Sequence, residues 1–253
     1  SCNKAFSSAT NSPLFKQKKR RINPKLRMLL ASGISMRRSA KILNVAATTV
    51  ERRTRYLAEQ CRIALEKEYA KIQGVRYFQF DELQTIEHTK CKPLSVVVIV
   101  DPETREILGF EVSSMPATGH LAKISRRKYG FRPDHRSMGL RRLFKKVEPM
   151  IAKNPQILSD FCPFYAPTVK ASFPSARHSQ VLGEKACVAG QGELKKVGRD
   201  PLFYINHTLA MLRANVNRLI RRTWCTTKDP ARLSDHLAIY TWVHNKKLVP
   251  QKV

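Results

Sequence analysis

The stretch Val75–His88 has the sequence VRYFQFDELQTIEH, in which apolar and aromatic residues alternate with polar ones near the period of a β-strand. Leu94–Val100 (LSVVVIV) and Ile107–Val112 flank the turn sequence DPETRE, and together they predict a β-hairpin. Further along the chain, PQILSDFCPFY predicts a short buried strand that ends at Asp160, and ARHSQVL predicts one more strand. These segments supply the strands of one sheet.

Two segments between and after these strands have helical spacing. Met138–Ala152 is the first, and Pro201–Lys228 (PLFYINHTLAMLRANVNRLIRRTWCTTK) is the second. The second contains no Asp or Glu, and its apolar residues predict a face that docks on the sheet: Ile205, Leu209, Leu212, Val216 and Leu219. Three antiparallel strands followed by alternating helices and strands fit an α+β or α/β, RNase H-like mixed sheet flanked by helices.

Two aspartates occupy notable places in this pattern. Asp81 follows YFQF and Asp160 follows ILS, so each is expected to end an apolar strand. If the two strands are parallel neighbours, both carboxylates emerge at the same edge and repel each other unless a divalent cation lies between them. That arrangement suits two-metal phosphoryl transfer. The alternative is that both are ordinary turn residues at strand ends.

The charge balance indicates the kind of partner. The chain has 253 residues, with 47 Lys plus Arg against 19 Asp plus Glu, and a net charge of +28. Like charges repel in the compact state, so a polyanionic partner is expected, nucleic acid first and an anionic membrane surface second. The longest apolar run, Leu94–Val100, is far too short for a membrane span. Six cysteines scattered singly fit a reducing cytosol.

The N-terminal part predicts a helical unit. Pro24 suits the first turn of a helix that Gly33 ends, and Ser35 can cap the next helix. After the turn sequence NVAATT, Thr48 or Thr49 can cap a basic third helix, which a long polar helix extends to about Ala70 as a connector. Helix, tight turn and basic helix are typical of a helix-turn-helix DNA reader. The alternative is an ordinary helical bundle with a solvated basic face.

Together these segments resemble the insertion-sequence transposases of the DDE type. The resemblance rests on the basic N-terminal segment, the helix-turn-helix, FQFDEL, ILSDFCPFY and LRANVNRLIRRTWCTTK, and it covers nearly the whole chain. Its most specific part is the pattern LRxxxxRLxRxTxxxTK from Leu212 to Lys228. The resemblance implies an RNase H-like catalytic domain, Mg²⁺ or Mn²⁺ as two ions, and double-stranded DNA (element ends and target) as partner. It also implies at least a homodimer on DNA and a place at the bacterial nucleoid in the cytoplasm.

By this resemblance, Asp81 and Asp160 are the first two catalytic, metal-binding carboxylates. The third acid falls seven residues before Arg213, where this chain has Asn206. Asn206 could offer its carbonyl oxygen as a neutral ligand, Glu193 of GQGELKK could take the place, or the copy could be catalytically decayed. His207 is open between a role at the metal edge and simple packing.

The predicted division of the chain has four parts. It comprises a basic arm at 1–23 with Cys2 as the remnant of a possible zinc ribbon, a helix-turn-helix with its connector at 24–73, a catalytic domain at 74–230 with a basic insert around 118–153, and a helical tail at 231–253. The predicted DNA contacts are Thr48, Thr49, Arg52, Arg53, Arg141, Arg142, Arg213, Arg218, Arg221, Arg222 and Lys228.

The expected function is a DNA transposase that binds terminal repeats and then cleaves and joins strands. A decayed transposase that only binds DNA, and an RNase H-like nuclease, are the alternatives. Within the last helix, Asn206, Arg213, Asn217 and Arg221 share one sector, which is expected to face the cleft at the two aspartates.

Overall fold

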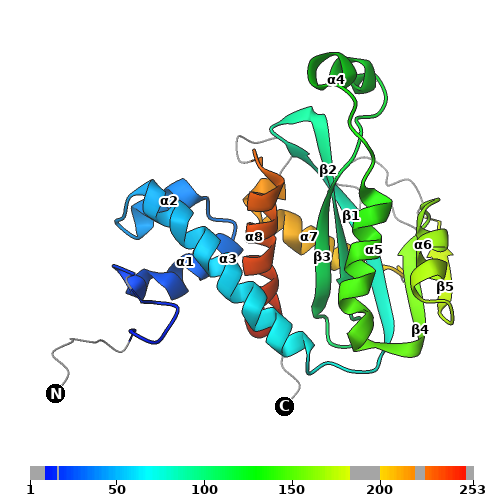
Figure 1. Cartoon of the computed structure of the whole chain (residues 1–253), viewed down its shortest axis with the longest axis horizontal. Helices are drawn as coiled ribbons and strands as arrows, with labels where there is room; N and C mark the ends of the chain where they lie inside the picture. Colours follow the sequence, from blue (N-terminus) through cyan, green and yellow to red (C-terminus); the bar gives the residue numbers. More distant parts are fainter. Residues whose placement is uncertain (1–8, 16, 183–199, 220–225, 249–253) are drawn as a thin grey trace.

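The computed structural model describes residues 9–15, 17–182, 200–219 and 226–248 (Figure 1). Three helices precede the sheet: α1 (Asn23–Ala31), α2 (Met36–Ile42) and α3 (Ala47–Tyr69). The strands are β1 (Val75–Glu87), β2 (Thr89–Val100), β3 (Ile107–Ser114), β4 (Ile151–Asp160) and β5 (Arg177–Val181). The other helices are α4 (Leu121–Tyr129), α5 (Arg136–Val147), α6 (Tyr165–Ser172), α7 (Phe203–Asn215) and α8 (Pro230–Val243).

The five strands form one mixed sheet in the order β3-β2-β1-β4-β5. β1 pairs with β2, and β2 with β3, in antiparallel fashion. β4 pairs in parallel with both β1 and β5. N-terminal helices followed by a mixed sheet with helices on its faces is an α+β, RNase H-like topology, so the predicted fold class is confirmed.

Alternation along the strands directs side chains to two separate cores. Phe78 and Phe80 of β1 face one core, which α5 and α6 cover, whereas Leu83 of β1 faces the other, which α7 and α8 cover. A strand exposes successive side chains to opposite faces, so a strand buried on both sides has few polar positions. Asp81 and Glu82 are the charged residues in the middle of this strand, where the polar Gln79 and Thr85 are also buried.

β1 does not end at Asp81, and this part of the prediction is wrong. Pairing with β2 continues from Asp81, opposite Val98, to Thr85, opposite Leu94. β1 pairs with β4 only as far as Phe80, which lies opposite Ser159. The carboxylates therefore lie where β4 stops, while β1 and β2 project beyond it.

The basic helix predicted for Pro201–Lys228 is shorter in the structure. Its predicted apolar residues are all buried in the core with the sheet, as expected: Ile205, Leu209, Leu212, Val216 and Leu219. However, α7 ends at Asn215, and a short 3₁₀ turn, Asn217–Leu219, follows an extended Val216. The prediction of one uninterrupted helix over Pro201–Lys228 is therefore wrong.

Contacts with the N-terminal helices explain the break. The amide of Gly33 donates to the carbonyl oxygen of Asn215 at 2.9 Å, and the side chain of Asn217 donates to the carbonyl oxygen of Gly33 at 2.5 Å. Asn217 thus contacts the loop after α1 and is taken out of the sector that was expected to face the cleft. Two helices, α4 and α6, were not predicted at all.

The N-terminal helices match most of their predicted boundaries. Pro24 lies in the first turn of α1, Gly33 after its end has a φ of 74°, and the side chain of Ser35 caps α2 by accepting from the amide of Arg38 at 3.3 Å. The capping prediction for the third helix is wrong, since α3 begins with Ala46 as its N-cap and no side chain caps it. Thr48 and Thr49 lie inside its first turn, and the connector is the same continuous helix.

α8 joins the helical part of the chain to the sheet. Its Leu233 and Leu237 belong to the core with β1 and β2, whereas its Ile239 belongs to a third core with α1 and α3. Arg62 of α3 forms an ion pair with Asp235 of α8 at 2.7 Å. No helix in the described residues is long and apolar enough to cross a bilayer.

Candidate active site

The parallel pairing of β1 and β4 brings two carboxyl groups together. Phe80 lies opposite Ser159, so Asp81 and Asp160 follow side by side at the end of β4. Both point to the face that α7 covers, as do Leu83 and Leu158 two residues away from them. The carboxyl groups are close enough for protonated Asp81 to donate a hydrogen bond to Asp160.

The surroundings of this pair disfavour two negative charges. Burial and the neighbouring charge of Asp160 raise the pKa of Asp81 to about 8. Burial, with a contribution from Glu82, also raises the pKa of Asp160. The buried Oδ1 atom of Asp160 has no hydrogen-bond partner among the described residues. Because a buried oxygen without a partner is costly, this atom fits a bound cation.

Asp81 and Asp160 therefore fit a divalent cation, and they are the residues that would hold it. A third protein ligand is not assembled: in the part of the chain that the structure describes, no three His, Cys, Asp or Glu side chains lie close enough to bind one ion. The carboxylate pair supplies two anionic ligands, which is compatible with a metal that completes its shell from water and substrate phosphate.

Asn206 lies on the exposed side of α7. Its side-chain amide donates to Oδ2 of Asp200 at 2.8 Å, while Oδ1 of Asp200 accepts from the amide of Leu202 at 2.9 Å. The side-chain bond of Asn206 thus goes to Asp200 and not to Asp81 or Asp160. Sequence reasoning missed Asp200, although an Asp directly before Pro201 at a helix start is a recognisable capping signal.

His207 and Glu82 also have partners outside the pair. Nδ1 of His207 lies 2.9 Å from Nη2 of Arg105 in the β2–β3 turn. Glu82 points to the opposite face from Asp81 and forms an ion pair with Arg136 at 3.0 Å. Its other oxygen accepts from the hydroxyl of Ser95 at 2.7 Å. These bonds offset the charge of Glu82 behind Asp81.

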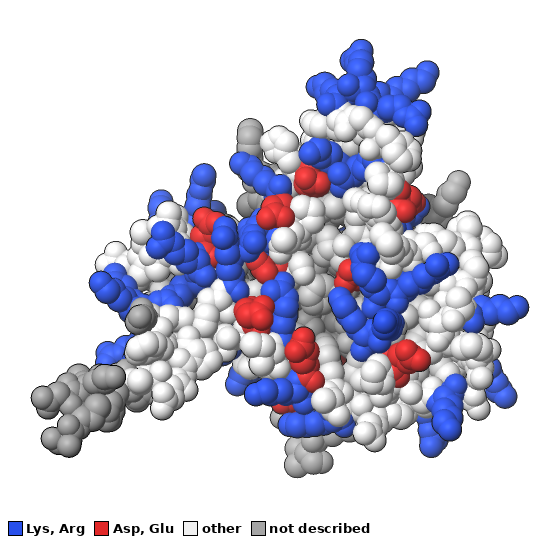
Figure 2. All heavy atoms as spheres, viewed as in Figure 1, with Lys and Arg blue, Asp and Glu red and all other residues white. Residues whose placement is uncertain are grey.

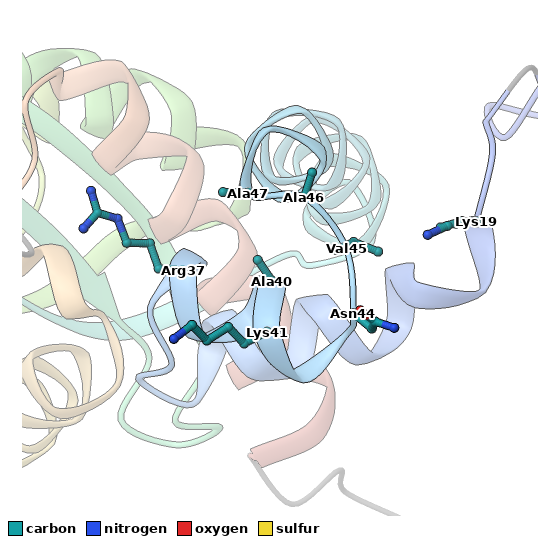
Figure 3. A pocket seen from close by; sticks show the side chains of 8 residues that line it. All are labelled: Lys19, Arg37, Ala40, Lys41, Asn44, Val45, Ala46 and Ala47. Atoms are coloured by element: carbon teal, nitrogen blue, oxygen red, sulfur yellow. The ribbon is translucent and has the colours of Figure 1, made fainter.

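The turn between α2 and α3 forms a hollow with a cationic lining. It has a volume of about 630 Å³, and Lys19, Arg37 and Lys41 supply its charges (Figure 3). Asn44 makes the tight turn with a φ of 49°, a conformation that Asn adopts more readily than most residues. Beside the hollow, the start of α3 exposes Thr48 and Arg52, while Thr49 and Arg53 are half-buried.

The remaining predicted DNA contacts are distributed over several surfaces. Arg141 on α5 is exposed, and its neighbour Arg142 forms an ion pair with Glu111 at 2.9 Å. Arg213 is exposed, and Arg218 donates to the hydroxyl of Thr227 at 3.3 Å. Lys228 is exposed. Residues that lie outside the described part are Cys2, Glu193, Arg221 and Arg222.

Comparisons with known proteins give only a distant likeness. No family model matches the chain, and no curated protein matches it. Among solved structures, a crystal structure of a pre-cleavage Mos1 transpososome matches at 13% identity, covering 96% of this chain and 81% of that chain, with a TM-score of 0.22. A crystal structure of the Mos1 mariner paired end complex with Mn matches at 15% identity, covering 98% and 83%, with a TM-score of 0.24. At such scores the likeness carries no weight for function.

Proposed function

We propose that this protein is a DNA transposase. It binds duplex DNA through the helix-turn-helix of α1–α3, and it cleaves and joins DNA strands at Asp81 and Asp160. The observation that carries the proposal is the pair itself: two half-buried carboxyl groups lie side by side at the end of a parallel strand, in a protein with a net charge of +28. Buried like charges are costly unless a cation and an anionic substrate complete the site.

Each part of the chain has a role in this proposal. Asp81 and Asp160 would hold the divalent cations, Mg²⁺ or Mn²⁺, which would lower the pKa of a bound water and stabilise negative charge at the phosphate. The exposed Arg213 lies on α7, the helix that covers the same face of the sheet as the pair, where it can attract phosphates. Thr48 and Arg52 at the start of α3 contact base edges and backbone.

A strand-transfer assay with the full chain tests this proposal. Labelled duplexes taken from the flanks of the gene are incubated with Mg²⁺ or Mn²⁺, and cleaved and joined products are separated by size. We expect products from the wild type and at least a hundredfold loss in Asp81→Asn and in Asp160→Asn, because each variant loses one anionic ligand. Glu148→Gln is the matched control, since this exposed carboxylate lies in the short 3₁₀ turn before β4, at the other end of that strand from Asp160.

A specific observation favours a second candidate, a decayed transposase that only binds DNA. The predicted third-acid position is Asn206, and its amide is bonded to Asp200 rather than turned to the aspartates. A site with two acids in place of three should bind metal more weakly. Sequence-specific binding without cleavage in either metal would establish this candidate and contradict the enzyme. Cleavage without joining would instead establish a nuclease.

Variants at Asn206 separate the two candidates further. Asn206→Glu adds the charge that the family position implies, so we expect it to increase cleavage or to restore it in an inactive protein. Asn206→Ala removes the bond to Asp200 and tests whether the amide contributes at all. Unchanged rates in both variants would remove Asn206 from the site.

A further inference from the structure

We propose that the α4 knob, residues 117–133 with α4 at its tip, is a second binding surface for duplex DNA. It holds the backbone of the double helix that passes over Asp81 and Asp160. The inference rests on the proposed function for the presence of DNA at the carboxylate pair. It adds a partner surface outside the helix-turn-helix and outside α7.

All the charged side chains of the α4 knob are positive. Residues 117–133 contain no Asp or Glu, and the cations are Lys123, Arg126, Arg127, Lys128 and Arg132. The first four are exposed, and Figure 2 shows Lys and Arg gathered over α4 at the top of the molecule. A cluster of one sign on a small projection attracts a polyanion and repels a second copy of itself.

The α4 knob contributes little to the hydrophobic core of the fold. Within α4 the one buried residue is Ser125, so the helix contributes almost nothing to a core. Three large apolar side chains of the α4 knob are instead exposed to solvent: Ile124 is 38% exposed, Tyr129 43% and Phe131 75%. A nine-residue helix is marginal on its own in water. Exposed aromatic rings among cations suit contact with a nucleic acid backbone and bases.

Two anchors, the buried Ser125 and the partly buried Arg132, hold the α4 knob in place. The hydroxyl of Ser125 donates to the carbonyl oxygen of Cys91 at 2.7 Å. Arg132 donates to the carbonyl oxygen of Met115 at 3.1 Å and to Glu87 at 3.1 Å. Because one bond holds α4 itself and the others hold the segment after it, the outer cations of the knob are positioned before DNA arrives. Such preorganisation lowers the entropy lost on binding.

The anchors also place the α4 knob at the end of β1, where a duplex that starts at the carboxylates and extends along β1 would reach it. Glu87 is the last residue of β1, six residues beyond Asp81, which is about 20 Å at about 3.3 Å per residue. Thr227 forms a bridge with Glu87, so the exposed Lys228 lies at this same end of β1. A duplex that extends about six base pairs from the carboxylates, at about 3.4 Å each, reaches this distance.

Salt-dependent binding tests the inference. All proteins carry Asp160→Asn, so strand cleavage does not interfere, and the probe is a mixed-sequence duplex of about 40 base pairs. In Arg126→Ala/Arg127→Ala/Lys128→Ala, we expect the slope of log affinity against log salt to fall by about 1 for each cation removed. The charge-preserving variant Arg126→Lys/Arg127→Lys/Lys128→Arg should keep the original slope.

A matched control removes the same charge elsewhere. Lys153, Lys170 and Arg177 are exposed and lie on β4, α6 and β5, so Lys153→Ala/Lys170→Ala/Arg177→Ala should leave the slope unchanged. As a direct probe of contact, a photoreactive benzophenone side chain in place of Phe131 should crosslink to the duplex. The same side chain in place of Lys170 should not.

Two results would overturn the inference. One is an equal slope in the α4 triple alanine variant and its parent, together with no crosslink from position 131. The other is an unchanged slope with an altered molar mass in light scattering, which would make the α4 knob a contact between copies of the chain. A wild type that binds DNA but never cleaves it would contradict the proposed function while leaving this binding result intact.

Discussion

At the scale of single residues, Asp81 links the protonation of the protein to its stability. Its pKa of about 8 lies far above the usual value, because the carboxyl group is buried beside Asp160. Between about pH 4 and pH 8 the folded protein therefore holds a proton that the unfolded chain has already released. This contribution to stability is fully present below about pH 4 and is lost as the pH rises through 8.

The variant Asp81→Asn should weaken this dependence. In chelator, we expect the wild type to lose stability between about pH 5 and pH 8 by at most about 1.4 kcal/mol per pH unit, and Asp81→Asn to lose less. Thermal denaturation at several pH values measures it. Added Mn²⁺ should raise the melting temperature of the wild type most at high pH, because a cation competes with the proton, and should have little effect on Asp81→Asn. Parallel pH curves for the two proteins would contradict this account.

The positions of the two aspartates could be predicted from sequence, and those of their neighbours could not. Apolar strands leading to Asp81 and Asp160 indicate a shared edge if the two strands are parallel neighbours, and the pairing of β1 with β4 meets that condition. In contrast, the bond from Asn206 to Asp200 and the ion pair between Glu82 and Arg136 depend on tertiary contacts between separate elements. Local patterns contain no information on such partners.

At the scale of elements, Gly33 decides where two helices end. It follows α1 with a φ of 74°, and its amide and carbonyl groups bond to Asn215 at the end of α7 and to Asn217 just after it. The start of α1 and the cap of α2 could be predicted because they depend on Pro24 and Ser35 nearby. The end of α7 could not, because its cause lies 184 residues away in the chain. Apolar spacing alone therefore predicted a helix that is too long.

Gly33→Ala should destabilise the protein more than a comparable change at Gly74. Both residues have a φ of 74°, so the left-handed strain of about 1–2 kcal/mol applies to each. A Cβ at Gly33 would also meet the carbonyl oxygen of Ala214 at 3.2 Å, whereas one at Gly74 would meet nothing within 4 Å. Urea denaturation of the two variants measures the difference. Equal losses would show that the contact with α7 adds nothing.

At the scale of the whole molecule, α8 makes the helical part and the sheet one structure. Leu233 and Leu237 pack against the sheet, and Ile239 packs against α1 and α3. Arg27 of α1 stacks on Trp242 at 3.9 Å, and His236 lies 2.8 Å from the carbonyl oxygen of Leu30. The sequence predicts only a helical tail at 231–253, because the pattern of a single helix does not show that α8 packs against both the sheet and the N-terminal helices. The division into domains remains a prediction.

Ile239→Ala should therefore destabilise both parts together. Ile239 is fully buried, so we expect a loss of about 2–5 kcal/mol and one unfolding transition for both parts. Hydrogen exchange of α3 amides and of β1 amides reports the two parts separately. Ile63→Ala on α3 is the matched control, since Ile63 is 39% exposed and should cost little. Separate transitions for the two probes would contradict a shared core.

The continuous α3 has a consequence for where DNA is cut. Its 23 residues make a rigid rod of about 35 Å at about 1.5 Å per residue. Thr48 and Arg52 lie near one end, while near the other Tyr69 donates to the carbonyl oxygen of Ile107 at 2.7 Å. In the proposed transposase, the length of α3 then sets the distance along the DNA between the recognised base pairs and the scissile phosphate. The sequence at the cut can vary freely, whereas inserting or deleting base pairs between the two points should move the cut and not the binding.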